Sequence, residues 1–211
     1  MMKKVKFIVF ICLFILLPLA YFNGFIRISD LTSEQESIAK KYGGVYVFDE
    51  KLEKEIDKRE EERRIMTKGL SGKKLAENRY AVDMTPVNEK LPRVLSNGKR
   101  YYSRKDNIKI DNYKILNNYE EKLKEFMGKD YDKYENYLSI NLGYFYIDND
   151  TIIPISIGVS TLYTEVTFGV YGDEASGIKF TKESTQRLIG DNKFYLTDNK
   201  FEKVSTSDKD K

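Results

Sequence analysis

The side chains that most often carry catalysis are almost absent from this chain. Its 211 residues include no histidine and a single cysteine, Cys12. Without histidine the chain cannot build a Ser-His-Asp or Cys-His nucleophile site or a histidine-containing zinc site, and it lacks the side chain that most often moves protons near neutral pH. The chemistry that remains is that of serine with lysine, paired carboxylates, tyrosine, or a hard metal held by oxygen atoms.

Two Ser-x-x-Lys sequences, Ser37 with Lys40 and Ser71 with Lys74, have the spacing of a hydroxyl activated by an amine. On a helix this spacing puts both groups on one face, but the lysine acts as a base only when desolvation lowers its pKa. Ser71 lies among charged residues, and the companion motifs of penicillin-recognising enzymes are absent. We interpret both matches as chance.

Clustered carboxylates occur at Asp148-Asn149-Asp150 and from Asp130 to Glu135. Neither stretch has the length and the glycine of a calcium loop, so we assign them to a turn and a helix start. We expect no metal and no cofactor. A glycosidase-type carboxylate pair remains an alternative, because its two members are distant in sequence.

Tyrosine is the one residue type whose distribution indicates a function. Nine of the 16 tyrosines lie between Tyr101 and Tyr146. Rigid amphipathic rings suit protein-recognition surfaces, and core packing is the competing interpretation. The predicted protein contacts are a basic aromatic hairpin and a three-residue-spaced tyrosine stripe: Lys99, Arg100, Tyr101 and Tyr102, and Tyr131, Tyr134 and Tyr137.

Charge is distributed unevenly along the chain. The formal net charge is +3, but beyond residue 27 it falls to −1, which argues against a nucleic-acid partner. The segment from Thr67 to Lys105 holds ten basic residues against three acidic ones, and the segment from Asp106 to Lys211 is net acidic. The two segments either neutralise each other or leave a basic patch for an anionic partner such as membrane headgroups, a cell-wall polymer or an acidic protein.

The N-terminal segment predicts a membrane location. An unbroken apolar run from Phe7 to Phe22 follows Lys3, Lys4 and Lys6. With Asn23 to Ile26 included, the run reaches the length of about 20 residues that a spanning helix needs. We expect residues 1–27 to be a single transmembrane signal-anchor in the inner membrane, with the N-terminus in the cytoplasm and the remainder periplasmic or extracellular. Cleavage after Ala20 is the alternative, although Pro18 makes that a poor site.

The elements expected after the anchor indicate an α+β fold. We predict membrane-proximal helices in residues 28–68, an α+β domain over 69–204 and a disordered tail over 205–211. The best amphipathic helix spans 113–127, with Asp111 as its cap and Gly128 at its end, and should pack on a curved antiparallel sheet. The other expected elements are helices over 33–42, 49–64 and 70–78, a loop over 85–92, a hairpin over 93–103 turning at Asn97-Gly98, and strands over 45–48, 138–147, 151–158, 161–171, 178–181 and 194–197.

Together these features predict a membrane-anchored extracytoplasmic protein-binding module without catalytic activity. An immunity-type neutraliser of an envelope-acting toxin is one concrete form of it, and a component of an envelope or secretion assembly is another. The alternative is a cell-envelope hydrolase that uses paired carboxylates or a Ser/Lys dyad.

Overall fold

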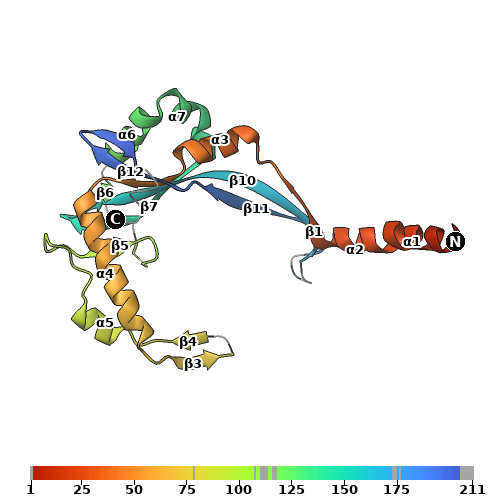
Figure 1. The fold of residues 1–211 in the computed structure, drawn as a ribbon, viewed down its shortest axis with the longest axis horizontal. Coiled ribbons are helices and arrows are strands. Elements are labelled where there is room, and N and C mark those ends of the chain that lie inside the picture. The colour runs from red at the N-terminus through yellow and green to blue at the C-terminus, as the bar shows by residue number, and fades with distance from the viewer. Residues whose placement is uncertain are drawn as a thin grey trace.

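The computed structural model describes residues 2–77, 79–106, 108–109, 114–115, 118–172, 175 and 177–204. The α+β class with a curled sheet is confirmed (Figure 1). The helices are α1 Met2–Ile11, the π-helical turn η1 Cys12–Leu16, α2 Leu17–Phe22, α3 Ser33–Tyr42, α4 Glu50–Lys68, α5 Thr85–Lys90, α6 Asn118–Met127, α7 Lys129–Tyr134 and the 3₁₀ turn η3 Glu135–Tyr137. The strands are β1 Asn23–Ser29, β2 Gly44–Val47, β3 Lys73–Ala76, β4 Arg79–Ala81, β5 Tyr101–Ser103, β6 Lys114–Ile115, β7 Leu138–Leu142, β8 Tyr144–Asp148, β9 Thr151–Pro154, β10 Ser156–Tyr171, β11 Lys179–Ile189, β12 Asn192–Thr197 and β13 Lys200–Lys203.

The N-terminal segment differs from the spanning helix that the sequence predicts. The helical residues are divided among α1, η1 and α2, and the chain becomes strand β1 at Asn23. Because β1 pairs with β10, the residues from Asn23 to Ser29 form a strand and do not extend the helix. In the part of the chain that the structure describes, no helix is both long and apolar enough to cross a membrane, so the predicted transmembrane helix over residues 1–27 is unsupported.

Strand β10 is the spine of the larger sheet, which has seven strands among the described residues. It pairs antiparallel with β1, β2, β7 and β11. The expectation of a purely antiparallel sheet is wrong at one place, because β2 pairs in parallel with β12. Since β2 also pairs with β10, it joins the segment over 28–68 to the segment over 69–204 within one sheet.

A second sheet of four short strands, in the order β5-β8-β9-β6, lies on the other side of the larger sheet from α3, α6 and α7 (Figure 1). The predicted hairpin across residues 148–150 is confirmed: β8 pairs with β9, and Asn149 and Asp150 have φ angles of 46° and 58°, as a two-residue turn requires. The turn at Asn97-Gly98 is also confirmed, with a φ of 77° at Gly98 and a bridge between Val94 and Arg100.

The main core is an aromatic cluster between the larger sheet and helices α3, α6 and α7. Tyr46 on β2 is fully buried at its centre. Its ring stacks on Phe194 with centroids 4.5 Å apart and meets Phe201 edge-on at 4.9 Å. Phe126, Leu123 and Met127 of α6 pack against the same cluster, so the predicted apolar face of this helix is confirmed at the described positions.

Helix α6 is shorter than the predicted helix over 113–127. It begins at Asn118, while Ile115 belongs to β6, which pairs in parallel with β9 at Ile152. The predicted cap Asp111 lies outside the described residues. The predicted helix over 70–78 is wrong, because β3 there pairs with β4 as a strand. The predicted loop over 85–92 is also wrong, because these residues include α5, which has Pro86 in its first turn. The predicted disordered tail over 205–211 lies outside the described residues.

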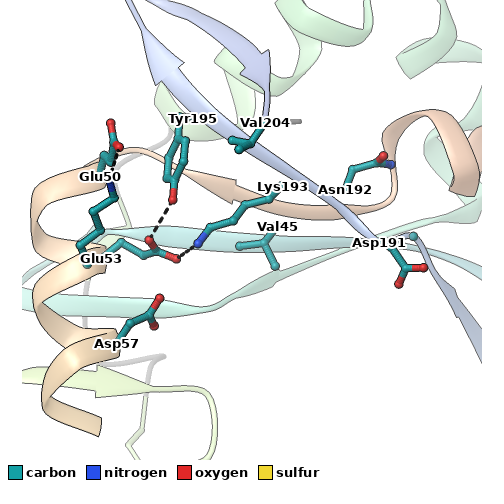
Figure 2. Close-up of a pocket in the computed structure, with 11 residues that line it drawn as sticks. Val45, Glu50, Glu53, Asp57, Asp191, Asn192, Lys193, Tyr195 and Val204 are labelled. Atoms are coloured by element: carbon teal, nitrogen blue, oxygen red, sulfur yellow. Dashed lines mark hydrogen bonds and ion pairs between the residues drawn. The ribbon is translucent and has the colours of Figure 1, made fainter. Parts of the chain in front are cut away.

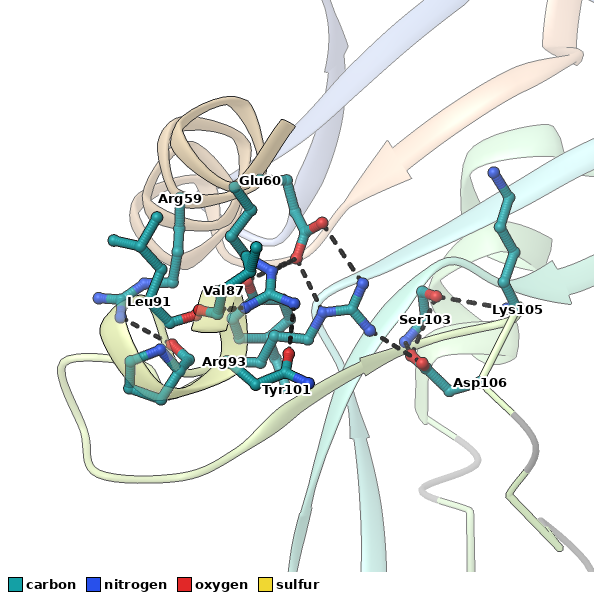
Figure 3. Close-up of polar contacts among 12 residues, drawn as sticks. Arg59, Glu60, Val87, Leu91, Arg93, Tyr101, Ser103, Lys105 and Asp106 are labelled. Carbon is teal, nitrogen blue, oxygen red and sulfur yellow. Dashed lines mark hydrogen bonds and ion pairs between the residues drawn. The ribbon is translucent and has the colours of Figure 1, made fainter. Parts of the chain in front are cut away.

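Helix α4 is rich in charged residues, but one side of it is packed against the rest of the chain. Its residues Leu52 and Ile56 pack with Leu95, Tyr101 and Ile155 in a second apolar cluster beneath the four-stranded sheet. Polar contacts of Arg59 and Glu60 then hold the second half of the helix against the segment that follows it, as shown in Figure 3. Both apolar and polar sides of α4 are therefore used to join the two sheets.

The polar contacts of α4 centre on Glu60 and Arg63. Arg63 is 5% exposed, and its guanidinium donates to the carbonyl oxygen of Leu91 and to Asn88 Oδ1, the latter at 2.7 Å. Glu60 accepts a hydrogen bond from the Tyr101 hydroxyl at 2.7 Å and from Arg93 Nε at 2.9 Å. Arg93 therefore lies in a fixed position between α4 and the loop that follows β5 (Figure 3).

The C-terminal part of β10 extends away from the two sheets and their helices toward the N-terminal helix (Figure 1). There it is flanked by β11 and, at its far end, by β1. We call residues 23–29, 163–171 and 179–186 the stalk. At about 3.3 Å per residue, the β10 part of the stalk is about 30 Å long. The stalk thus holds the N-terminal helix away from the rest of the described chain, which we call the head.

Candidate functional site

Two adjacent cavities lie on the head, and both are lined by Val45, Glu53 and Gly190. The larger, of about 930 Å³, lies between α4 and β12 and is drawn in Figure 2. The smaller, of about 550 Å³, lies against the face of the larger sheet that is turned toward α4 and β5. Because the two cavities share Glu53, this carboxylate is at the centre of the candidate site.

Helix α4 positions the acidic groups of the larger cavity. Asp49 caps the helix by accepting a hydrogen bond from the Leu52 amide at 2.9 Å. Glu50, Glu53 and Asp57 then follow at helical spacings of three and four residues, which places them on one side of the helix, facing the cavity. This wall of the cavity therefore carries three carboxyl groups together with Lys54, whose amine lies 2.9 Å from Glu50 Oε1.

Strand β12 supplies the opposite wall. Lys193 and Tyr195 are two residues apart, so they lie on the same face of the strand. Lys193 Nζ lies 2.7 Å from Glu53 Oε1, and the Tyr195 hydroxyl donates to Glu53 Oε2 at 3.3 Å (Figure 2). Glu53 is 5% exposed and Lys193 is half-buried, and their ion pair ties α4 to β12.

The electrostatics of the cavity keep Lys193 charged. Burial alone would lower the pKa of Lys193, but the hydrogen bonds and negative charge of Glu53 and the contact with Tyr195 raise it. The pKa of Asp57 is raised, first by loss of solvent around its carboxyl and then by the negative charge of Glu53. Asp57 is thus a carboxyl group of this site whose proton is held more tightly than usual.

The carboxyl groups of this site raise the questions of metal binding and of general acid catalysis. Among the described residues, no group of three or more acidic or cysteine side chains is placed to hold a metal ion. A raised carboxyl pKa is a property of general acids, and Asp57 has one. Its neighbour Glu53 comes from the same face of the helix and is held by Lys193, so Glu53 is not available as a second catalytic carboxylate.

Replacing Asp57 by asparagine is expected to stabilise the head at neutral pH. The folded-state pKa of Asp57 lies above its unfolded value of about 4, so its ionisation disfavours folding as pH rises between these two values. Urea unfolding at pH 3.5 and at pH 7 measures the effect. The variant should gain stability at pH 7 and little at pH 3.5, whereas an equal change at both values would contradict the assignment.

The basic aromatic hairpin is only partly on the surface. Tyr101 is 1% exposed and belongs to the second apolar cluster, where its hydroxyl bonds Glu60. Lys99 is half-buried and forms an ion pair with Asp148 at 2.7 Å, which neutralises part of the basic segment internally. Arg100 is exposed and lies over the ring of the half-buried Tyr102 at 5.4 Å. Contact with a partner is therefore available to Lys99, Arg100 and Tyr102, and Tyr101 serves the core.

The tyrosine stripe is likewise divided between core and surface. Tyr131 and Tyr134 are 3% and 8% exposed and pack in the main core, with the Tyr131 hydroxyl bonded to Glu120 at 3.0 Å. Tyr137 follows in η3 and is 46% exposed. The structure places this group on the helix-covered side of the larger sheet and the hairpin in the four-stranded sheet, so it does not bring the two predicted clusters together.

Neither cavity is predicted from the sequence. Glu53 lies in a segment that contains many other charged residues, so the sequence does not single it out. Its partners Lys193 and Tyr195 follow about 140 residues later, on strand β12. Comparison of the chain with family models, with curated proteins and with solved structures finds no match.

Proposed function

We propose that the chain is a non-catalytic protein-binding module, attached to a membrane by its N-terminal helix, with the head on the extracytoplasmic side. The observation that carries the proposal is the stalk, which separates the apolar helix from a head that bears two cavities and an exposed basic aromatic surface. A neutraliser of an envelope-acting toxin and a component of an envelope assembly are two forms of such a module.

Membrane attachment is supported by the surface of the N-terminal helix. Its described apolar side chains are exposed with the exception of Ile11, and they include Phe7 at 64% and Phe14 at 67%. A helix that is apolar all round needs apolar surroundings. The basic residues before the run, Lys3, Lys4 and Lys6, favour retention of the N-terminus in the cytoplasm.

Protein recognition is supported by the residue types that remain on the surface of the head. Arg100, Tyr102 and Tyr137 are arginine and tyrosine side chains, which contribute strongly to binding at protein interfaces. Lys99 precedes Arg100 in the hairpin, and its amine is held by Asp148.

The rival function, a hydrolase using paired carboxylates, has one observation in its favour: the raised pKa of Asp57 beside Glu53. In glycosidases the two carboxyl groups flank the scissile bond from opposite sides. Here both come from one face of α4, which favours binding. The serine and lysine form is not favoured either, since Ser71 and Lys74 are exposed and Lys74 lies on strand β3.

Site-specific photo-crosslinking of the full chain in its own cells tests the proposal. A photoreactive residue at Arg100, Tyr102 or Tyr137 should yield a discrete adduct with one protein, and the chain should resist carbonate extraction from membranes. Lys182 on the stalk is the matched exposed control and should yield none. Extraction of the chain as a soluble protein would overturn the membrane part, and the absence of any adduct from the three head positions would overturn the binding part.

A further inference from the structure

The smaller cavity has a floor formed by one face of the larger sheet. Along β10, Ile157 and Val159 belong to the main core, so Gly158 between them faces the other side of the sheet. Its register partners on the neighbouring strands, Asn141 of β7 and Val45 of β2, share that face. Ile189 of β11, opposite Ser160, continues the floor.

This floor is apolar and has open space at its centre. Val45 is 41% exposed and Ile189 is 69% exposed, and together they give this face of the sheet an exposed apolar surface of the kind found in ligand-binding grooves. At Gly158 an added Cβ atom would meet no heavy atom within 4 Å. The glycine therefore leaves a depression that an apolar group can occupy.

The rim of the same cavity is positively charged. Arg104 and Lys105 come from the loop after β5, and Arg187 comes from β11. All three are exposed, and the described residues, with 107 and 110–113 among those not described, provide no anionic partner for any of them. The two acids in the wall are already used, since Glu53 is paired with Lys193 and Glu60 with Arg93.

We propose that this cavity binds an amphipathic anion, an apolar chain that ends in a carboxylate or a phosphate. The apolar chain lies over Gly158, between Val45 and Ile189, and the anionic group lies among Arg104, Lys105 and Arg187. The volume of about 550 Å³ is in the range of small-molecule sites, about 300–1,000 Å³. The exposed apolar floor and the unpaired cations are thereby satisfied by one ligand. This inference does not depend on the proposed protein partner.

Binding of a chemically simple probe to the full chain tests the inference. The protein is held in a nonionic detergent, and three diazirine-labelled dodecyl probes are compared: a carboxylate, a phosphate and a trimethylammonium. The two anions should label the peptides that contain Val45, Gly158 or Ile189, and the cation should label them at least tenfold less. Equal labelling by the cation, or labelling confined to the N-terminal helix, would overturn the proposal.

Two variants test the floor and the rim separately. Gly158→Leu should fill the depression, and Arg104→Glu with Arg187→Glu should reverse the rim charge, each weakening the anionic probes at least tenfold. The matched control, Lys122→Glu with Lys129→Glu, changes the same charge on helices α6 and α7 and should bind as the wild type does. Thermal unfolding checks that each variant is folded. If Gly158→Leu does not fold, the floor is tested instead by probe binding to Gly158→Ala and by the identity of the labelled peptides, and the rim by the charge variants. Wild-type affinity in a folded floor or rim variant would overturn the proposal.

A vesicle arm distinguishes the source of the anion. Liposomes of phosphatidylcholine with and without phosphatidylglycerol are offered to the same variants. Labelling by the monomeric probes supports an amphiphile in the cavity, whether or not it is drawn from a bilayer. Binding to anionic vesicles without any labelling of the floor by monomeric probes would mean that the rim recognises a membrane surface, and would overturn occupancy of the cavity.

Discussion

Replacing Gly44 by alanine is expected to destabilise the head by more than about 3 kcal/mol, because two penalties combine. Gly44 has a φ of +146°, a conformation that residues with a side chain rarely adopt. An added Cβ atom would also lie 2.0 Å from the carbonyl oxygen of Asn192, inside the parallel pairing of β2 with β12. Urea unfolding of the full chain in detergent, followed by circular dichroism, measures the change.

The adjacent strand offers a matched control. Gly158 lies on β10 beside Val159, the residue that pairs with Gly44, and an added Cβ atom there meets open space. Gly158→Ala should therefore alter the free energy of unfolding by less than about 1 kcal/mol. Equal destabilisation by the two variants would show that the close contact between β2 and β12 does not limit the fold.

Truncation of Tyr46 should have a comparable effect. Tyr46→Ala removes a fully buried ring that contacts Phe126, Phe194 and Phe201, and large aromatic deletions of this kind cost about 3–5 kcal/mol. Chemical denaturation should show the midpoint lowered and the denaturant dependence little changed.

Tyr46→Phe separates the ring from the hydroxyl. The hydroxyl donates to the carbonyl oxygen of Tyr42 at 2.7 Å, at the end of α3. Its removal leaves the stacking in place and should cost about 1–2 kcal/mol, since the Tyr42 carbonyl then lacks this bond. A phenylalanine variant as unstable as the alanine variant would place the main contribution in the hydrogen bond instead of the aromatic packing.

Local chemistry explains which elements are predictable from this sequence. The start of α3 is an example: the predicted helix over 33–42 begins at Ser33, where the side chains of Thr32 and Gln35 each accept a hydrogen bond from the other's amide. The turns at Asn97-Gly98 and at Asn149-Asp150 form because Gly98, Asn149 and Asp150 tolerate the positive φ angles that they adopt. The apolar face of α6 follows from helical periodicity at Leu123, Phe126 and Met127.

Elements that depend on distant partners escaped prediction. Ile115 has the spacing of the helix that follows it, but pairing with Ile152 makes it part of β6. Lys73 to Ala76 has no alternating pattern and becomes a strand only because β4 lies beside it. At residues 85–92, Pro86 marks the first turn of α5, where a proline is tolerated, and not a loop.

The candidate site was hidden for the same reason. The three-residue spacing of Tyr131, Tyr134 and Tyr137 carries no information on which rings face the core, and two of the three do. The ion pair of Glu53 with Lys193 depends on β12 lying beside β2, and the cationic rim combines Arg104 with Arg187 from a distant strand. Such sites arise from topology, which local residue patterns do not encode.

One uninterrupted strand, β10, supplies both the floor of the smaller cavity at Gly158 and the ribbon that leads toward the N-terminal helix. Beyond the cavity, β10 pairs with β11 from Ser160 to Phe168 and again at Tyr171, with a register shift between the two stretches. A partner that engages the cavity therefore meets it about 30 Å of strand away from that helix.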